Sequence, residues 1–127
     1  MRMTRFVLDG DDVRAEVQDA PPWEATPTFD GQDLRGVSTA PLDEVPRAEI
    51  QYVRIEAGGH FVMHTSPDLA FCQVIHGRGL LRLPDGTELA YEGPELFVFH
   101  PGSLHEWDRI EEDTLLSNCL VRSPQQR

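Results

Sequence analysis

The chain has 127 residues, enough for one domain with a single packed core. Hydrophobic residues make up 39% of it and charged residues 26%, which argues against a disordered or membrane-spanning class. Twenty-two acidic residues against eleven basic ones give a net charge of -11, so nucleic acid and anionic membranes are not expected partners. The first residues show no secretory pattern, and a cytoplasmic location is expected.

Residues 1–48 are expected to form amino-terminal strands followed by a long arm. The predicted strands are 5–9 and 12–18. Residues 19–47 contain five prolines and little periodicity, which predicts a long connection without regular structure. Trp23 and Phe29 within it would be costly to leave in water. The arm is therefore expected to pack over the barrel or over a second subunit, with disorder as the alternative.

Residues 49–127 are expected to form a barrel domain. They consist of short β-branched, aromatic and aliphatic runs separated by turns rich in glycine and proline, a pattern typical of antiparallel sandwiches and barrels. The predicted strands are 49–57, 60–65, 69–76, 79–84, 87–92, 95–100 and 114–122. No stretch keeps helical spacing, so helices should be short or absent and the fold class all-β.

Two histidines stand in segments that carry a motif. In residues 58–77, Gly58, His64 and Gly77 have the spacing of the first cupin motif, G-x5-H-x-H-x3-4-E-x6-G, which this segment resembles. Ser66 occupies the place of the second histidine and Ala70 the place of the glutamate.

A later segment, residues 93–109, resembles the second cupin motif, G-x5-P-x-G-x2-H-x3-N. Gly102 and His105 match, while His100 replaces the proline and Arg109 replaces the asparagine. The resemblance covers roughly the last seventy residues and implies a cupin barrel, that is, a double-stranded β-helix or jelly roll, here with a long amino-terminal arm.

The resemblance also implies a metal site inside the barrel. Only His64 and His105 remain of its usual ligands, because serine is a poor ligand for a transition metal and alanine is none. A divalent ion such as Zn, Fe, Mn or Ni is therefore expected to be held weakly or to be absent. His60, which shares strand parity with His64, and His100 are the candidates for a third ligand, and Asp68 and Cys72 are other possible replacements. Each histidine could instead be a hydrogen-bonded core residue.

Several other side chains are expected to line the interior pocket beside His64 and His105. They are Tyr52, His60, Cys72, His100 and Trp107. Cys72 has the parity of the lost glutamate, and Trp107 shares a face with His105 because it follows two residues later. Cys72 and Cys119 both lie in apolar runs and are expected to be buried, reduced thiols.

Three classes of function follow from the resemblance. In the first, His64 and His105 catalyse proton transfer on a small organic molecule, as an isomerase, cyclase, dehydratase or decarboxylase would. In the second, the barrel binds or senses a small metabolite without metal or catalysis. A structural or storage role is the third and least favoured, and dioxygenase chemistry is also disfavoured because no inherited third ligand is present. The arm and the resemblance together predict a homodimer.

Overall fold

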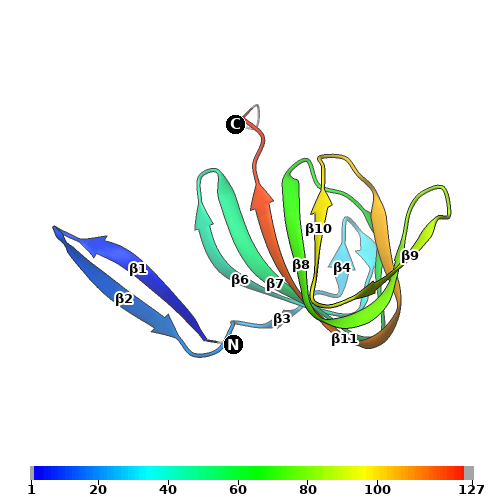
Figure 1. Ribbon diagram of the computed structural model, residues 1–127, viewed down its shortest axis with the longest axis horizontal. Coiled ribbons are helices and arrows are strands. Elements are labelled where there is room, and N and C mark those ends of the chain that lie inside the picture. The colour runs from blue at the N-terminus through cyan, green and yellow to red at the C-terminus, as the bar shows by residue number, and fades with distance from the viewer. Residues whose placement is uncertain (1, 125–127) are drawn as a thin grey trace.

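The computed structural model describes residues 2–124, and these residues form strands and turns with no helix (Figure 1). In chain order the strands are β1 (Met3–Asp9), β2 (Asp12–Gln18), β3 (Glu24–Ala25), β4 (Thr28–Phe29), β5 (Gln32–Asp33), β6 (Arg35–Val45), β7 (Ala48–His64), β8 (Leu69–Arg82), β9 (Glu88–Glu92), β10 (Glu95–Phe99) and β11 (His105–Val121). The all-β fold class is confirmed. Within residues 2–124 there is no helix that could cross a membrane.

Seven strands form one antiparallel sheet in the order β10-β8-β11-β7-β6-β3, with β9 attached to β8. The strands β7, β8 and β11 are long and strongly curved, so the sheet rolls up into a barrel (Figure 1). The predicted barrel segment 49–127 ends in residues 125–127, which lie outside the described residues.

Two pairs of predicted strands are each a single bent strand. The pair 49–57 and 60–65 is continuous as β7, and the pair 69–76 and 79–84 is continuous as β8. Gly77 shows the reason, because its φ of +107° bends β8 without ending it. A Cβ atom there would lie 2.5 Å from the Cα atom of Thr114, so the bend also lets β8 cross close over β11.

The strand predicted at 114–122 starts much earlier, at His105. The first half of β11 was missed because it carries many acidic residues, which are depleted in strands. It nevertheless starts with the alternation of a half-buried strand, since His105 and Trp107 are buried, and the alternation breaks at Arg109, whose φ is +46°. The acidic side chains Glu106 and Asp108 bond to Arg82 on the neighbouring strand β8, at 2.7 Å and 3.0 Å.

The prediction of an irregular connection over residues 19–47 is wrong for its second half. Residues 35–45 form β6, which pairs with β7 through partners such as Val37↔Ile55 and Thr39↔Val53. The barrel therefore begins before residue 49. Proline is tolerated in β6 because only the two-residue strand β3 pairs with its other edge, and the register shifts next to Pro41.

The strands β1 and β2 form a separate two-stranded hairpin that projects from the barrel (Figure 1). Arg5 ties it to β6, because its guanidinium donates to the Asp43 carboxylate and to the carbonyl oxygen of Leu42. Trp23 in the following connection stacks on Tyr52 of β7, with ring centroids 6.3 Å apart. This part of the arm therefore packs on the barrel of its own chain.

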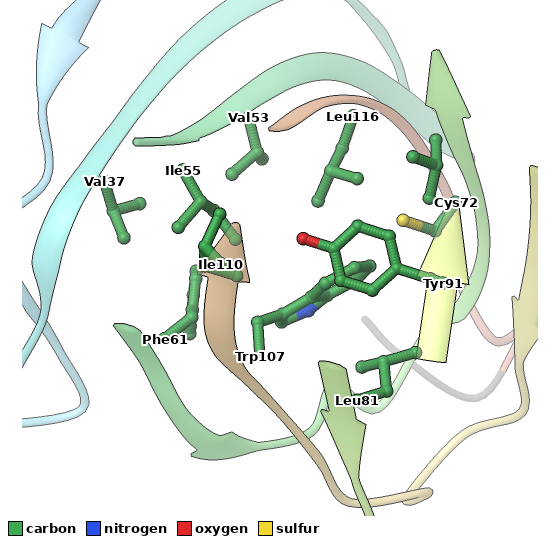
Figure 2. Packing of buried hydrophobic residues seen from close by; sticks show 11 residues of the cluster. Val37, Val53, Ile55, Phe61, Cys72, Leu81, Tyr91, Trp107, Ile110 and Leu116 are labelled. Atoms are coloured by element: carbon green, nitrogen blue, oxygen red, sulfur yellow. The ribbon is translucent and has the colours of Figure 1, made fainter. Parts of the chain in front are cut away.

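The core lies between the curved strands (Figure 2). Its buried members are Val37, Val53, Ile55, Phe61, Cys72, Val74, Leu81, Tyr91, Trp107, Ile110 and Leu116. They come from β6, β7, β8, β9 and β11, so burial of this one cluster holds these strands together. Some of these side chains also line a cavity of the barrel.

Candidate functional site

The barrel encloses a cavity of about 220 Å³. Among its lining residues are five that the sequence singled out, His64, Cys72, His100, His105 and Trp107. Tyr52 and His60 are not among them. The cavity thus brings together residues from both motif segments, which are far apart in the sequence.

His64 and His105 lie side by side on two paired strands. His64 ends β7 and His105 starts β11, and the two are register partners. Their ring centroids lie 4.4 Å apart. The Nδ1 atom of His64 is 2.7 Å from the carbonyl oxygen of Val62, and the Nδ1 atom of His105 is 3.1 Å from that of Ser103. Since a carbonyl oxygen only accepts, each Nδ1 carries the hydrogen, and each neutral ring keeps its lone pair on Nε2.

Aromatic side chains hold both imidazoles in place. The ring of Phe61 stacks on His64 with centroids 4.1 Å apart, and Phe99 stacks on His105 at 3.8 Å and 11°. Phe29, from the β4–β5 hairpin, contacts His64 edge-on at 5.3 Å and lines the cavity. The sequence analysis did not single out Phe61 and Phe99 for the site, although both stand within five residues of a motif histidine or of His100.

Burial keeps the two imidazoles neutral. Burial, with a smaller contribution from the neighbouring His64, lowers the pKa of His105 from 6.5 to about 4, although the hydrogen bond to Ser103 opposes the shift. Burial also lowers the pKa of His64, while the bond to Val62 and the charge of Asp30 oppose that shift. Both rings are therefore neutral near pH 7, and each presents one basic nitrogen atom, Nε2, in the same cavity.

Cys72 lines the same cavity but offers little reactivity. Burial raises the pKa of its thiol from 9.0 to about 12. Since the thiolate is the nucleophilic form, this cysteine stays a protonated, apolar part of the wall at physiological pH.

Tyr52 lies on the outer face of the barrel. It pairs with Ala40 and Ser117 on the neighbouring strands and stacks against Trp23. Its neighbours Gln51 and Val53 line the cavity instead, as strand alternation requires. The prediction that Tyr52 lines the pocket is therefore wrong, because it assigned Tyr52 to the inner face of β7.

His60 also points away from His64, and the parity argument fails because β7 contains a bulge. His105 pairs with His64 and Trp107 with Phe61, so three steps along β7 oppose two steps along β11. The extra residue reverses the alternation between positions 60 and 64. The Nε2 atom of His60 instead lies 2.6 Å from the Glu106 carboxylate.

The side chains present do not fit the metal cage of the family that the motifs resemble. Ser66, in the place of the second histidine, accepts a hydrogen bond from the backbone of Asp68 at 2.9 Å, and Ala70 has no donor atom. Over residues 2–124, no three histidine, cysteine, aspartate or glutamate side chains are grouped to hold one ion. His100 lines the cavity without completing such a group.

Comparison of the fold with solved structures identifies the architecture. A cupin 2 conserved barrel domain protein from Rhodopseudomonas palustris superposes with a TM-score of 0.68 at 18% identity, covering 86% of this chain and 76% of that one. The cupin domain of Cnp3 from Schizosaccharomyces pombe has a TM-score of 0.68 at 14% identity, covering 96% and 84%. The chain has the cupin fold. No family profile matches the sequence, and no curated protein matches it.

A third structure of this fold superposes with a similar TM-score. The polyketide cyclase RemF from Streptomyces resistomycificus has a TM-score of 0.64 at 16% identity, covering 71% of this chain and 68% of its own. In the cupin barrel described here, His64 and His105 hold the two surviving motif positions, and they meet in the cavity.

Proposed function

We propose that this cupin is a small-molecule enzyme in which His64 and His105 move a proton on a substrate held in the barrel cavity. The proposal is supported by the two neutral imidazoles, which lie 4.4 Å apart and each keep an Nε2 lone pair. Isomerisation, cyclisation, dehydration and decarboxylation all depend on proton transfer of this kind.

The surroundings of the imidazoles favour such a transfer. A low pKa makes each ring a weak base on its own, but an anion formed next to it stabilises the imidazolium strongly where little water screens the two charges. The hydrogen bonds from Nδ1 to Val62 and Ser103 keep both rings oriented. A proton taken up by one ring can pass to the other and return to the substrate at a different atom.

The fold comparison supports the enzyme proposal only by analogy. One structure of the same fold is a polyketide cyclase, so a barrel of this kind can host ring-forming chemistry.

The test is exchange of hydrogen for deuterium on 2-tetralone, an uncharged ketone with acidic C–H bonds, followed by proton NMR in D2O. We expect the protein to accelerate the exchange over buffer. His64→Asn and His105→Asn should each reduce the acceleration at least about tenfold, because asparagine keeps a donor for the backbone carbonyl but lacks the Nε2 base. His76→Asn is the matched control, since His76 is exposed on β8.

Two outcomes contradict the proposal. The exchange could equal that in buffer alone, or both cavity variants could be as active as the wild type. Binding of small molecules without any exchange would favour the alternative function, a metal-free barrel that binds or senses a metabolite.

We further propose that two copies of the chain pair through the β1–β2 hairpin. Register partners share a face, which places Phe6, Leu8, Val13 and Val17 together on one side, with 57% to 79% of each side chain exposed. The opposite side carries Arg5, which holds the barrel. A lone hairpin with an apolar face in water is marginally stable.

The outer face of β8 and β10 supplies a surface of the same kind. Phe71, Leu96 and Val98 lie side by side there and are exposed. The hairpin stands apart from these two strands of its own chain (Figure 1). A second copy can cover both apolar surfaces at once by exchanging hairpins around a two-fold axis, and we take this as the arrangement of the dimer.

A further inference from the structure

Among the described residues, two that line the cavity each carry a side-chain oxygen atom that is buried without a hydrogen-bond partner. These atoms are Oδ1 of Asp68 and Oδ1 of Asn118. Asp68 lies in the loop between β7 and β8, and Asn118 lies on β11 between Gln51 and Cys72 of the adjacent strands. A buried acceptor that lost its bond to water and gained no other is costly, so such atoms in a cavity are places where a ligand can donate.

The charge of the wall restricts the ligand. In the described part of the chain, no arginine side chain lines the cavity, and the sequence contains no lysine. The imidazoles of His64 and His105 are neutral because burial lowers their pKa values. Of the other ionisable side chains in the lining, Asp68 is acidic and His100 is exposed. A buried carboxylate or phosphate group would therefore meet the Asp68 carboxylate and no arginine or lysine, and it would lose its hydration.

The apolar part of the wall indicates a flat ligand. Phe29, Phe61, Phe99 and Trp107 all line the cavity. Aromatic side chains favour stacked or edge-to-face contacts with another ring. An apolar cavity of about 150 Å³ holds one benzene molecule. The cavity here measures about 220 Å³, which leaves room for substituents on one ring or for a second small ring.

From these observations we infer that the cavity binds an uncharged aromatic compound with at least two hydroxyl groups. One hydroxyl donates to Asn118 Oδ1 and another to Asp68 Oδ1, while the ring lies among the aromatic side chains. The inference rests on the proposed function, because it names the substrate class for the cavity that holds His64 and His105. The imidazoles then face a phenolic molecule, whose O–H and ring C–H bonds are suited to removal of a proton by a weak base.

The test compares four ring compounds of similar size by NMR titration of the purified full chain. Resorcinol carries two hydroxyl donors, 1,3-dimethoxybenzene has none, 3-hydroxybenzoate is an anion and 3-hydroxybenzylamine is a cation. We expect resorcinol to bind at least about tenfold more tightly than the dimethoxy compound and the benzoate, and no less tightly than the amine. The inference is overturned if resorcinol fails to bind at about 10 mM, or if any other compound binds more tightly.

Variants separate the two acceptors. Asn118→Leu keeps the number and branching of the side-chain heavy atoms and removes the acceptor, so it should weaken resorcinol about tenfold and change the affinity for 1,3-dimethoxybenzene much less. Asp68→Asn keeps an oxygen acceptor and should change resorcinol affinity less than about threefold. Ser117→Ala, on the outer face of β11, is the control. Equal loss for both ring compounds in Asn118→Leu would show general disruption of the cavity and overturn the assignment.

The two proposals can fail separately. Resorcinol binding with the expected variant pattern, but without accelerated exchange of the ring hydrogens of resorcinol or of the C–H hydrogens of 2-tetralone, sustains the ligand class and refutes the proton-transfer function. Exchange that depends on His64 and His105, together with preferred binding of the anion or the cation, refutes the ligand class alone.

Discussion

Acidification should destabilise the protein through His105. This side chain is only 7% exposed, and its pKa is lowered from 6.5 to about 4, chiefly by burial. Between pH 6.5 and about 4, the imidazole of His105 binds a proton in the unfolded chain but not in the folded chain. The free energy of unfolding therefore decreases as the pH falls below 6.5, and the decrease is complete below about 4. A shift of this size corresponds to about 3 kcal/mol in total, and to about 1.3 kcal/mol between pH 7.5 and 5.5.

The assay is urea unfolding at pH 7.5 and 5.5, a range that stays above the isoelectric point of about 4.7, near which a protein of low net charge tends to precipitate. The carboxyl groups with lowered pKa values, such as those of Glu106 and Asp108, titrate below this range. His105→Leu should therefore lose a large part of the pH dependence. His64 supplies a further part, since burial lowers its pKa too, and the exposed-residue variant His76→Leu should keep the wild-type dependence. The reasoning is refuted if His105→Leu loses as much stability on acidification as the wild type.

Two other predictions concern the bend in β8 and the hairpin. Gly77→Ala should cost at least about 3 kcal/mol in a denaturant titration, because its Cβ would lie 2.5 Å from the Thr114 Cα atom. Gly86→Ala also has positive φ but nothing within 4 Å, and should cost only about 1 kcal/mol; equal costs would contradict the role of the bend. The wild type should show the mass of two chains in light scattering, and Phe6→Asp with Leu8→Asp should show one. A wild-type mass of one chain rules out the pairing proposed for the hairpin.

The glycine framework and the histidine spacing carried most of the useful information in the sequence. Gly58 and Gly77 adopt positive φ values of +78° and +107°, which few other residues tolerate, so their positions could be recognised from the sequence. The pairing of His64 with His105 followed from the two motif segments. What the glycines do was predicted less well, because a glycine that bends a strand has the same appearance in a sequence as one that ends it.

Errors about the site arose where the local pattern lacks information. The bulge between Phe61 and His64 turns His60 away from the cavity. No residue type in that stretch indicates that β7 contains an extra residue there. The five prolines of residues 19–47 favour a loop, yet residues 35–45 contain only Pro41, and pairing with β7 decides their structure. The sequence analysis did not identify Asn118, although it points to the same face of β11 as Leu116 and Leu120, which also line the cavity.

The central claim is that His64 and His105 are neutral near pH 7 and present their Nε2 lone pairs in one cavity. Long-range ¹H–¹⁵N NMR of the histidine rings reports the tautomer and the protonation state of each nitrogen. At pH 7 both rings should be neutral with the hydrogen on Nδ1, and the His105 signals should change only as the pH approaches about 4. A proton on Nε2 of either ring at pH 7 would contradict the account.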